Sequence, residues 1–230
     1  MSSSLIPAAE PPRRRFLRSA GTAVAASLVL AACGDDPQVE PTSSALISLG
    51  SGDAGLLHYL FRLKQWQAAF YQKVTTTPPA DLRAGELDTL KEITLHEQIQ
   101  RDYLLAVGAQ NNQTDLFAIG VFSFDTLTLV TREQVLGTAR SFEDLAVAAV
   151  HGTLPLFTGS LFMQVAAKMA SVEARHSTTV RELLVPGSFT AAEVVDPATG
   201  LEKTKTVDEV VTELNKYASI PFTAAQLPTS

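Results

Sequence analysis

Residues 166–183 read AAKMASVEARHSTTVREL and repeat apolar side chains at the spacing of one helical face. That face combines four apolar residues with two polar ones: Ala166, Met169, Glu173, His176, Val180 and Leu183. Glu173 and His176 therefore fall where a packed helix faces its core. Because burying an unpaired carboxylate is costly, Glu173 has to meet a cation or hydrogen-bond donors from other helices.

Three further segments carry the same periodicity, and no segment shows a convincing strand alternation. Helices are predicted over about 53–74, from 82 or 85 to 107, over 124–152 and, around the motif above, over 159–184. We expect an all-α antiparallel four-helix bundle over 53–185, with residues 109–121 as one long crossover. A C-terminal extension, 186–230, contains a short amphipathic helix near 207–217, which we expect to dock on the bundle.

Each predicted helix places polar residues near the middle of its apolar face. They are Lys64 and Gln67 in the first helix, Glu97 and Gln100 in the second, Glu143 in the third, and Glu173 and His176 in the fourth. Tyr71 lies four residues after Gln67, on the same face of the first helix. Because the apolar faces of all four helices turn toward the core, we expect the polar groups on those faces to meet at the centre of the bundle.

The pair Glu173-x-x-His176, joined to Glu97 and Glu143 on other helices, resembles the ferritin-like di-iron family. In that family two helices each supply a Glu and two each supply Glu-x-x-His. The phrases AAFY (68–71), SFEDLAV (141–147) and ASVEARH (170–176) are similar to those of exported ferritin-like proteins of the desiccation-related type. The resemblance implies that Glu97, Glu143, Glu173 and His176 are metal ligands.

Two positions depart from the family pattern. Lys64 stands where the first helix should carry a Glu, and Gln100 stands where the second should carry a His. In the family those two residues are terminal ligands of the same metal ion, so both losses fall on one site. Either one iron or manganese ion remains on Glu97, Glu143, Glu173 and His176, or Lys64 completes a metal-free network. Oxygen chemistry that needs two adjacent irons is disfavoured in both cases.

Two other histidines have ordinary structural interpretations. His96 precedes Glu97, so it should point about 100° away from the seam and is not expected to be a ligand. His58 lies beside the apolar face of the first helix, and a surface or boundary position is expected for it.

The N-terminus has the features of an export signal. Arg13-Arg14-Arg15-Phe16-Leu17 resembles a twin-arginine motif, and the apolar stretch 20–32 is shorter than the 20 or so residues that span a bilayer. Leu30-Ala31-Ala32-Cys33 resembles a bacterial lipobox, which implies a cleaved signal over 1–32, a lipid on Cys33 and a tether over 33–52. A signal cut at an Ala-x-Ala-type site, with Cys33 incidental, is the alternative.

Composition restricts the remaining function classes. The chain has 230 residues, one Cys, a net charge of −6 and 46% apolar residues, which excludes a disulfide scaffold and disfavours a nucleic-acid binder. We expect a membrane-anchored protein of the bacterial periplasm or envelope, with a stress or desiccation role implied by the resemblance. The alternatives are a metal-dependent oxidoreductase or iron/manganese handler, and an envelope protein-interaction module. A homo-oligomer is possible for any of them, and no protein partner is identified.

Overall fold

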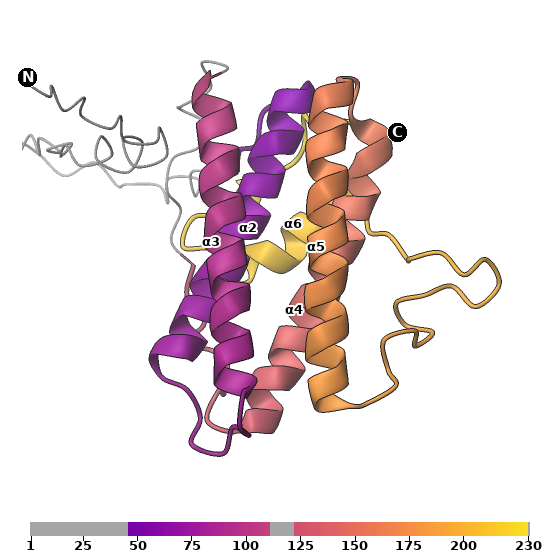
Figure 1. Cartoon of the computed structure of the whole chain (residues 1–230). Helices are drawn as coiled ribbons and strands as arrows, with labels where there is room; N and C mark the ends of the chain where they lie inside the picture. Colours follow the sequence, from indigo (N-terminus) through magenta and orange to yellow (C-terminus); the bar gives the residue numbers. More distant parts are fainter. Residues whose placement is uncertain (1–45, 111–121, 230) are drawn as a thin grey trace, which may run out of the picture. The chain divides into compact units, whose positions relative to one another are not determined.

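The structure is a computed structural model that describes residues 46–110 and 122–229. Four long helices form the bundle: α2 (Gly52–Thr76), α3 (Glu86–Gln110), α4 (Arg132–Thr153) and α5 (Ser160–Leu184) (Figure 1). The predicted all-α bundle is confirmed. None of the helices in the described ranges is both long enough and apolar enough to cross a membrane.

The helices pack as two hairpins, α2 with α3 and α4 with α5 (Figure 1). The start of α4 lies near the start of α3. A hydrogen bond shows this, since Arg132 Nη2 donates to Glu86 Oε1 at 2.6 Å. It also donates to the carbonyl of Leu183, at the end of α5, at 2.6 Å. α3 and α4 therefore run in the same direction. Residues 111–121 of the predicted crossover lie outside the described residues.

Two helix boundaries differ from the prediction. α4 begins at Arg132 rather than near 124, because Thr131 and Gln134 form a capping box that fixes the N-terminus there. α3 continues through Gly108 to Gln110 instead of ending at Val107. Gly108 is buried, so packing of the last turn outweighs the glycine's helix-propensity cost of about 1 kcal/mol.

The C-terminal extension returns to the bundle and docks on it. α6 (Val207–Asn215) buries its apolar residues Val207, Val210, Val211 and Leu214, which confirms the expected docking. Two short strands, β1 (Ile47–Ser48) and β2 (Phe222–Thr223), pair in parallel and were not predicted, because two residues are too few to show alternation. Gly152 permits the close crossing of this tail, since a β-carbon there would collide with the carbonyl of Lys205.

α2 is buried along nearly its whole length. The extension and β1 cover the side of α2 that the other bundle helices leave open, and Leu56, Leu60 and Trp66 are completely buried. His58 is buried as well, so the expected surface or boundary position was wrong. Its Nδ1 lies 3.2 Å from the carbonyl of Leu49, and Arg62 Nε donates to its Nε2 at 3.0 Å.

Candidate metal centre

Three helices bring four metal-ligating side chains to the centre of the bundle. α3 supplies Glu97, α4 supplies Glu143, and α5 supplies Glu173 and His176. Their ligand atoms all lie within 4.8 Å of one another. The three carboxylates are completely buried and His176 is 5% exposed. The sequence-predicted cluster is therefore assembled by the fold.

Lys64 of α2 reaches into this cluster. Its ammonium lies 3.0 Å from Glu97 Oε2, contacts Glu173 Oε2, and donates to Gln67 Oε1 at 2.7 Å. Gln67 Nε2 in turn donates to Glu173 Oε2 at 2.9 Å and to Glu143 Oε2 at 3.3 Å. Lys64 and Gln67 face inward, as their seam position predicted.

His176 occupies the opposite side of the three carboxylates from Lys64. Its Nδ1 lies 3.0 Å from Glu97 Oε1, 3.9 Å from Glu143 Oε2 and 3.9 Å from Glu173 Oε1. Glu97 and Glu173 therefore each direct Oε2 to the lysine and Oε1 toward the imidazole. Two carboxylates thus bridge a fixed cation on one side and a metal-ligating nitrogen on the other.

The carboxylates differ in the charge that their surroundings favour. Burial and the negative charge of Glu173 raise the pKa of Glu143 to about 8. Burial opposes the charge of Glu97, but Lys64 and His176 outweigh it and lower the pKa of Glu97. At neutral pH Glu143 is therefore largely protonated, while Glu97 stays ionised.

The surroundings favour the charged forms of the two basic groups, Lys64 and His176. Burial alone would lower the pKa of Lys64, but Glu173 and Glu97 outweigh it and the pKa is raised. Burial likewise opposes the charge of His176, whereas its hydrogen bond to Glu97 and the charges of the other carboxylates raise its pKa. In the metal-free state the surroundings therefore favour a neutral carboxyl on Glu143 and a protonated imidazole on His176.

The donor set fits one divalent ion. Oε1 of Glu143 and Oε1 of Glu173 are buried without a hydrogen-bond partner among the described residues. Donors about 2.1 Å from one ion lie roughly 3.0–4.2 Å apart, depending on the angle between them. The 3.0–3.9 Å separations around His176 Nδ1 match that spacing, and the most distant of the four ligand atoms, up to 4.8 Å apart, would have to move closer together around an ion. Within residues 46–110 and 122–229 no second group of this kind is found, and the Lys64 ammonium lies against Oε2 of Glu97 and Oε2 of Glu173.

Tyr71 lies one turn beyond Gln67 on the same seam of α2. Its side chain is completely buried, and its hydroxyl lies close to the carboxyl group of Glu143. Burial and the nearby charge of Glu143 raise its pKa well above the ordinary value. Tyr71 is therefore a neutral phenol beside the cluster.

Gln100 does not join the cluster. It lines a surface groove between α3 and α5 together with Tyr103, Met169 and other residues, and its buried Oε1 finds no partner in the described ranges. The position one turn after Glu97 is therefore occupied by a neutral amide that points to the helix interface.

His96 contacts the cluster through His176, and this contact was not predicted from the sequence. Although its side chain is exposed, its Nδ1 lies 3.0 Å from His176 Nε2, and the two rings stack at 5.3 Å with an interplanar angle of 7°. His96 reaches toward α5, where it contacts His176. A single helix does not show this, because the contact depends on how α3 and α5 are rotated against each other.

The fold and the centre together define a four-helix bundle with an internal carboxylate–histidine cluster. The model of the ferritin-like domain family matches residues 52–186. Because this match covers more than half of the chain, the protein belongs to the ferritin-like domain family. A search of curated proteins gives no significant match.

Proposed function

We propose that this chain is a lipid-anchored ferritin-like protein of the bacterial envelope whose bundle centre holds one divalent ion, iron or manganese. One observation carries the metal part of the proposal. In both Glu97 and Glu173, Oε2 contacts the Lys64 ammonium and Oε1 faces His176 Nδ1. Lys64 thus takes the place of one metal of a pair, and the remaining donors serve the other.

The donor chemistry suits a hard or borderline ion. Glu97, Glu143 and Glu173 offer oxygen and His176 offers an imidazole nitrogen, a combination that fits Fe(II) or Mn(II) better than soft metals. When bound, such an ion supplies Lewis acidity and one-electron redox chemistry. Lys64 keeps its position by ion pairing, so chemistry that uses two ions about 4 Å apart is not expected.

Metal stoichiometry tests this proposal directly. The full-length chain, loaded anaerobically with Fe(II) or Mn(II) and freed of loose metal, should retain one ion per chain. His176→Ala should lose it, whereas His151→Ala, at the far end of α4, should keep it. Two ions per chain, or none, would contradict a single-ion centre. Anomalous scattering from the loaded protein should place the ion beside His176 Nδ1.

We further propose a structural or protective role in stress or desiccation rather than turnover. The resemblance of the seam phrases to exported desiccation-related proteins supports this role, and the loss of one metal position argues against di-iron oxidation. Consumption of Fe(II) or peroxide by the loaded protein should be slow and unchanged in Glu173→Ala. Fast turnover that disappears in Glu173→Ala would instead favour a metal-dependent oxidoreductase.

The membrane anchor is proposed from the N-terminal sequence. The twin-arginine-like run at 13–17 supports export in a folded form, and Cys33 after Leu30-Ala31-Ala32 supports lipid attachment. Cells grown with labelled palmitate should label the protein and retain it in the membrane fraction. Cys33→Ser should abolish the label and release the protein, whereas an unlabelled wild type would remove the anchor from the proposal.

A further inference from the structure

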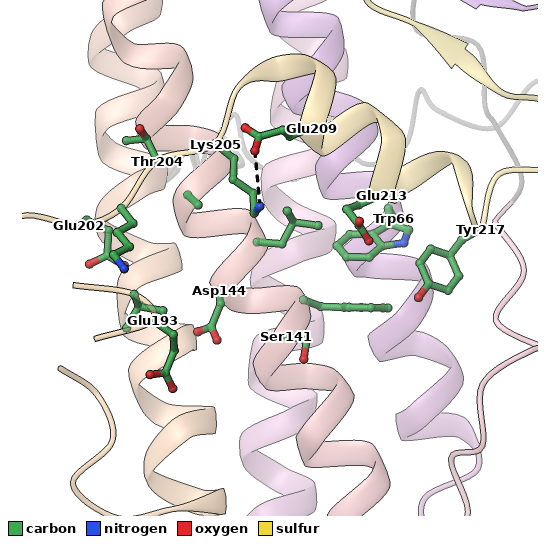
Figure 2. Close-up of a pocket in the computed structure, with 15 residues that line it drawn as sticks. Trp66, Ser141, Asp144, Glu193, Glu202, Thr204, Lys205, Glu209, Glu213 and Tyr217 are labelled. Atoms are coloured by element: carbon green, nitrogen blue, oxygen red, sulfur yellow. Dashed lines mark ion pairs between the residues drawn. The ribbon is translucent and has the colours of Figure 1, made fainter. Parts of the chain in front are cut away.

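A cavity of about 530 Å³ lies between α4 and the C-terminal extension (Figure 2). Residues 193–205 and α6 form one wall, α4 forms the other, and Trp66 of α2 lies at one end. None of the four residues of the candidate metal centre lines it. The cavity is therefore a separate feature of the fold.

One end of the cavity is aromatic. The ring centroids of Trp66 and Phe142 lie 4.0 Å apart, and Tyr217 is 5.9 Å from Trp66 and 5.4 Å from Phe142. Trp66 is completely buried, yet its indole Nε1 has no hydrogen-bond acceptor among the residues that the structure describes. Leu145 and Ala148 continue this apolar surface along α4.

The opposite end of the cavity is acidic, and Glu193 and Glu202 lie there in Figure 2. Glu193 and Asp144 are both paired with Arg181, at 3.2 Å and 2.7 Å. Glu202 is different, because within residues 46–110 and 122–229 no cation lies within ion-pair distance of it. Burial and the charge of Asp144 also raise the pKa of Glu202.

The charge of the lining selects the sign of a ligand. Five carboxylates and two lysines line the cavity, and Arg181 and Lys216 pair with three of those carboxylates. Glu202 is thus the lining carboxylate that keeps a negative charge without an ion pair among the described residues. A cation can pair with Glu202 at one end, and an apolar body can lie against Leu145, Phe142 and the aromatic end.

We propose that this cavity binds a small organic ammonium ion with an apolar body, through Glu202 for the charge and the Trp66–Phe142–Tyr217 aromatic cluster for the body. Aromatic side chains offer a large apolar surface to the body of the ligand, and a charged hydrogen bond to a carboxylate is stronger than a neutral one. Neither interaction depends on metal at the bundle centre.

Trp66 reports directly on the cavity, because it is the sole tryptophan of the chain. The full-length protein is titrated with phenethylammonium chloride while tryptophan fluorescence is followed, and 2-phenylethanol serves as the neutral probe of similar shape. We expect a saturable response to the ammonium ion and at least about tenfold weaker binding of the alcohol. Equal binding of the two, or no saturable response to phenethylammonium, overturns the proposal.

Three variants locate the binding. Glu202→Gln should weaken phenethylammonium binding by about tenfold. Glu92→Gln, which removes the same charge from the exposed side of α3, should leave it unchanged. Ala148→Phe should fill the cavity and abolish binding, with circular dichroism showing that each variant keeps its helices. Equal weakening in Glu202→Gln and Glu92→Gln, or unaltered binding to Ala148→Phe, also overturns the proposal.

Discussion

The ammonium of Lys64 lies 3.0 Å from Oε2 of Glu97, and both side chains are completely buried. The pair crosses from α2 to α3 at the level where the carboxylates of α4 and α5 converge. Since water cannot screen a buried charge, each partner depends on the other for its ionised state. Lys64 is therefore part of the structural centre of the bundle, and in the proposed function it also stands in for one metal ion.

We expect Lys64→Met to destabilise the metal-free protein by about 3–5 kcal/mol, because it leaves Glu97 and Glu173 without their buried cation. For a chain of this size that corresponds to a fall in Tm of roughly 6–20 °C. Thermal melting in the presence of a chelator measures the effect. An unchanged Tm would show that the carboxylates do not need the ammonium.

Lys73→Met is the matched control. Lys73 pairs with Asp125 at 2.7 Å, but their side chains are 42% and 82% exposed. Removing a lysine there should cost less than about 1 kcal/mol, because solvent screens an exposed pair. Added Mn(II) should stabilise Lys64→Met more than it stabilises Lys73→Met, since a bound ion restores the missing positive charge.

Glu143 should make the metal-free protein less stable as the pH rises. Its pKa is raised to about 8 in the folded state, from an ordinary value of 4.5. A carboxyl with a raised folded-state pKa contributes its stability fully below the unfolded value, and that contribution is lost as the pH rises through the folded value. Urea unfolding at pH 5, 6, 7 and 8 with chelator should therefore show a declining free energy of unfolding.

Glu143→Gln isolates this contribution from that of His176, whose raised pKa acts in the same direction. The amide cannot ionise, so the variant should lose part of the decline and be more stable than wild type near pH 8. Identical pH profiles for the two proteins would mean that Glu143 titrates normally. Metal affinity should rise with pH in the wild type, because the ion competes with the protons on Glu143 and His176.

The central cluster was predictable because helical spacing is local. Glu97, Glu143, Glu173 and His176 each fall on an apolar face at steps of three or four residues, so any packed bundle must bring them inward. The same reasoning placed Lys64 and Gln67 at the centre. Which oxygen of Glu97 faces Lys64 and which faces His176 depends on rotamers that the sequence does not show.

Features that depend on distant packing escaped prediction. His58 reads as a boundary residue on α2, but the returning tail and β1 bury it. His96 is exposed and still contacts His176, because the rotation of α3 against α5 sets that contact. The cavity beside Trp66 exists only because residues 193–217 fold back on α4.

His96 should orient the proposed metal ligand. If His176 binds an ion through Nδ1, its Nε2–H is free to donate to His96 Nδ1, 3.0 Å away, and this fixes the plane of the ring. Residues that hydrogen-bond to a metal ligand in this way change metal affinity by about 10–100-fold.

We expect His96→Ala to weaken Mn(II) binding by at least about tenfold while changing Tm little, because its side chain is exposed. His151→Ala should leave the affinity unaltered, and an unaltered affinity in His96→Ala would remove the orienting role.

A second metal position should be recoverable by reversing the two substitutions. Lys64→Glu with Gln100→His returns a carboxylate to α2 and an imidazole to the residue one turn after Glu97 on α3. Glu97 and Glu173 already present Oε2 to the place that Lys64 now fills, so a second ion would find two bridging oxygens there.

We expect the double variant to bind two Mn(II) or Fe(II) ions per chain, whereas wild type and Gln100→His bind one. Without metal the double variant should be the least stable, because it carries four buried carboxylates and no ammonium. Its Tm should rise on metal addition by more than that of wild type, since stabilisation grows with each ion that binds only the folded state. Metal content by mass spectrometry and melting with and without chelator test both expectations. A double variant that still binds a single ion would show that these two substitutions are not sufficient to restore the second metal position.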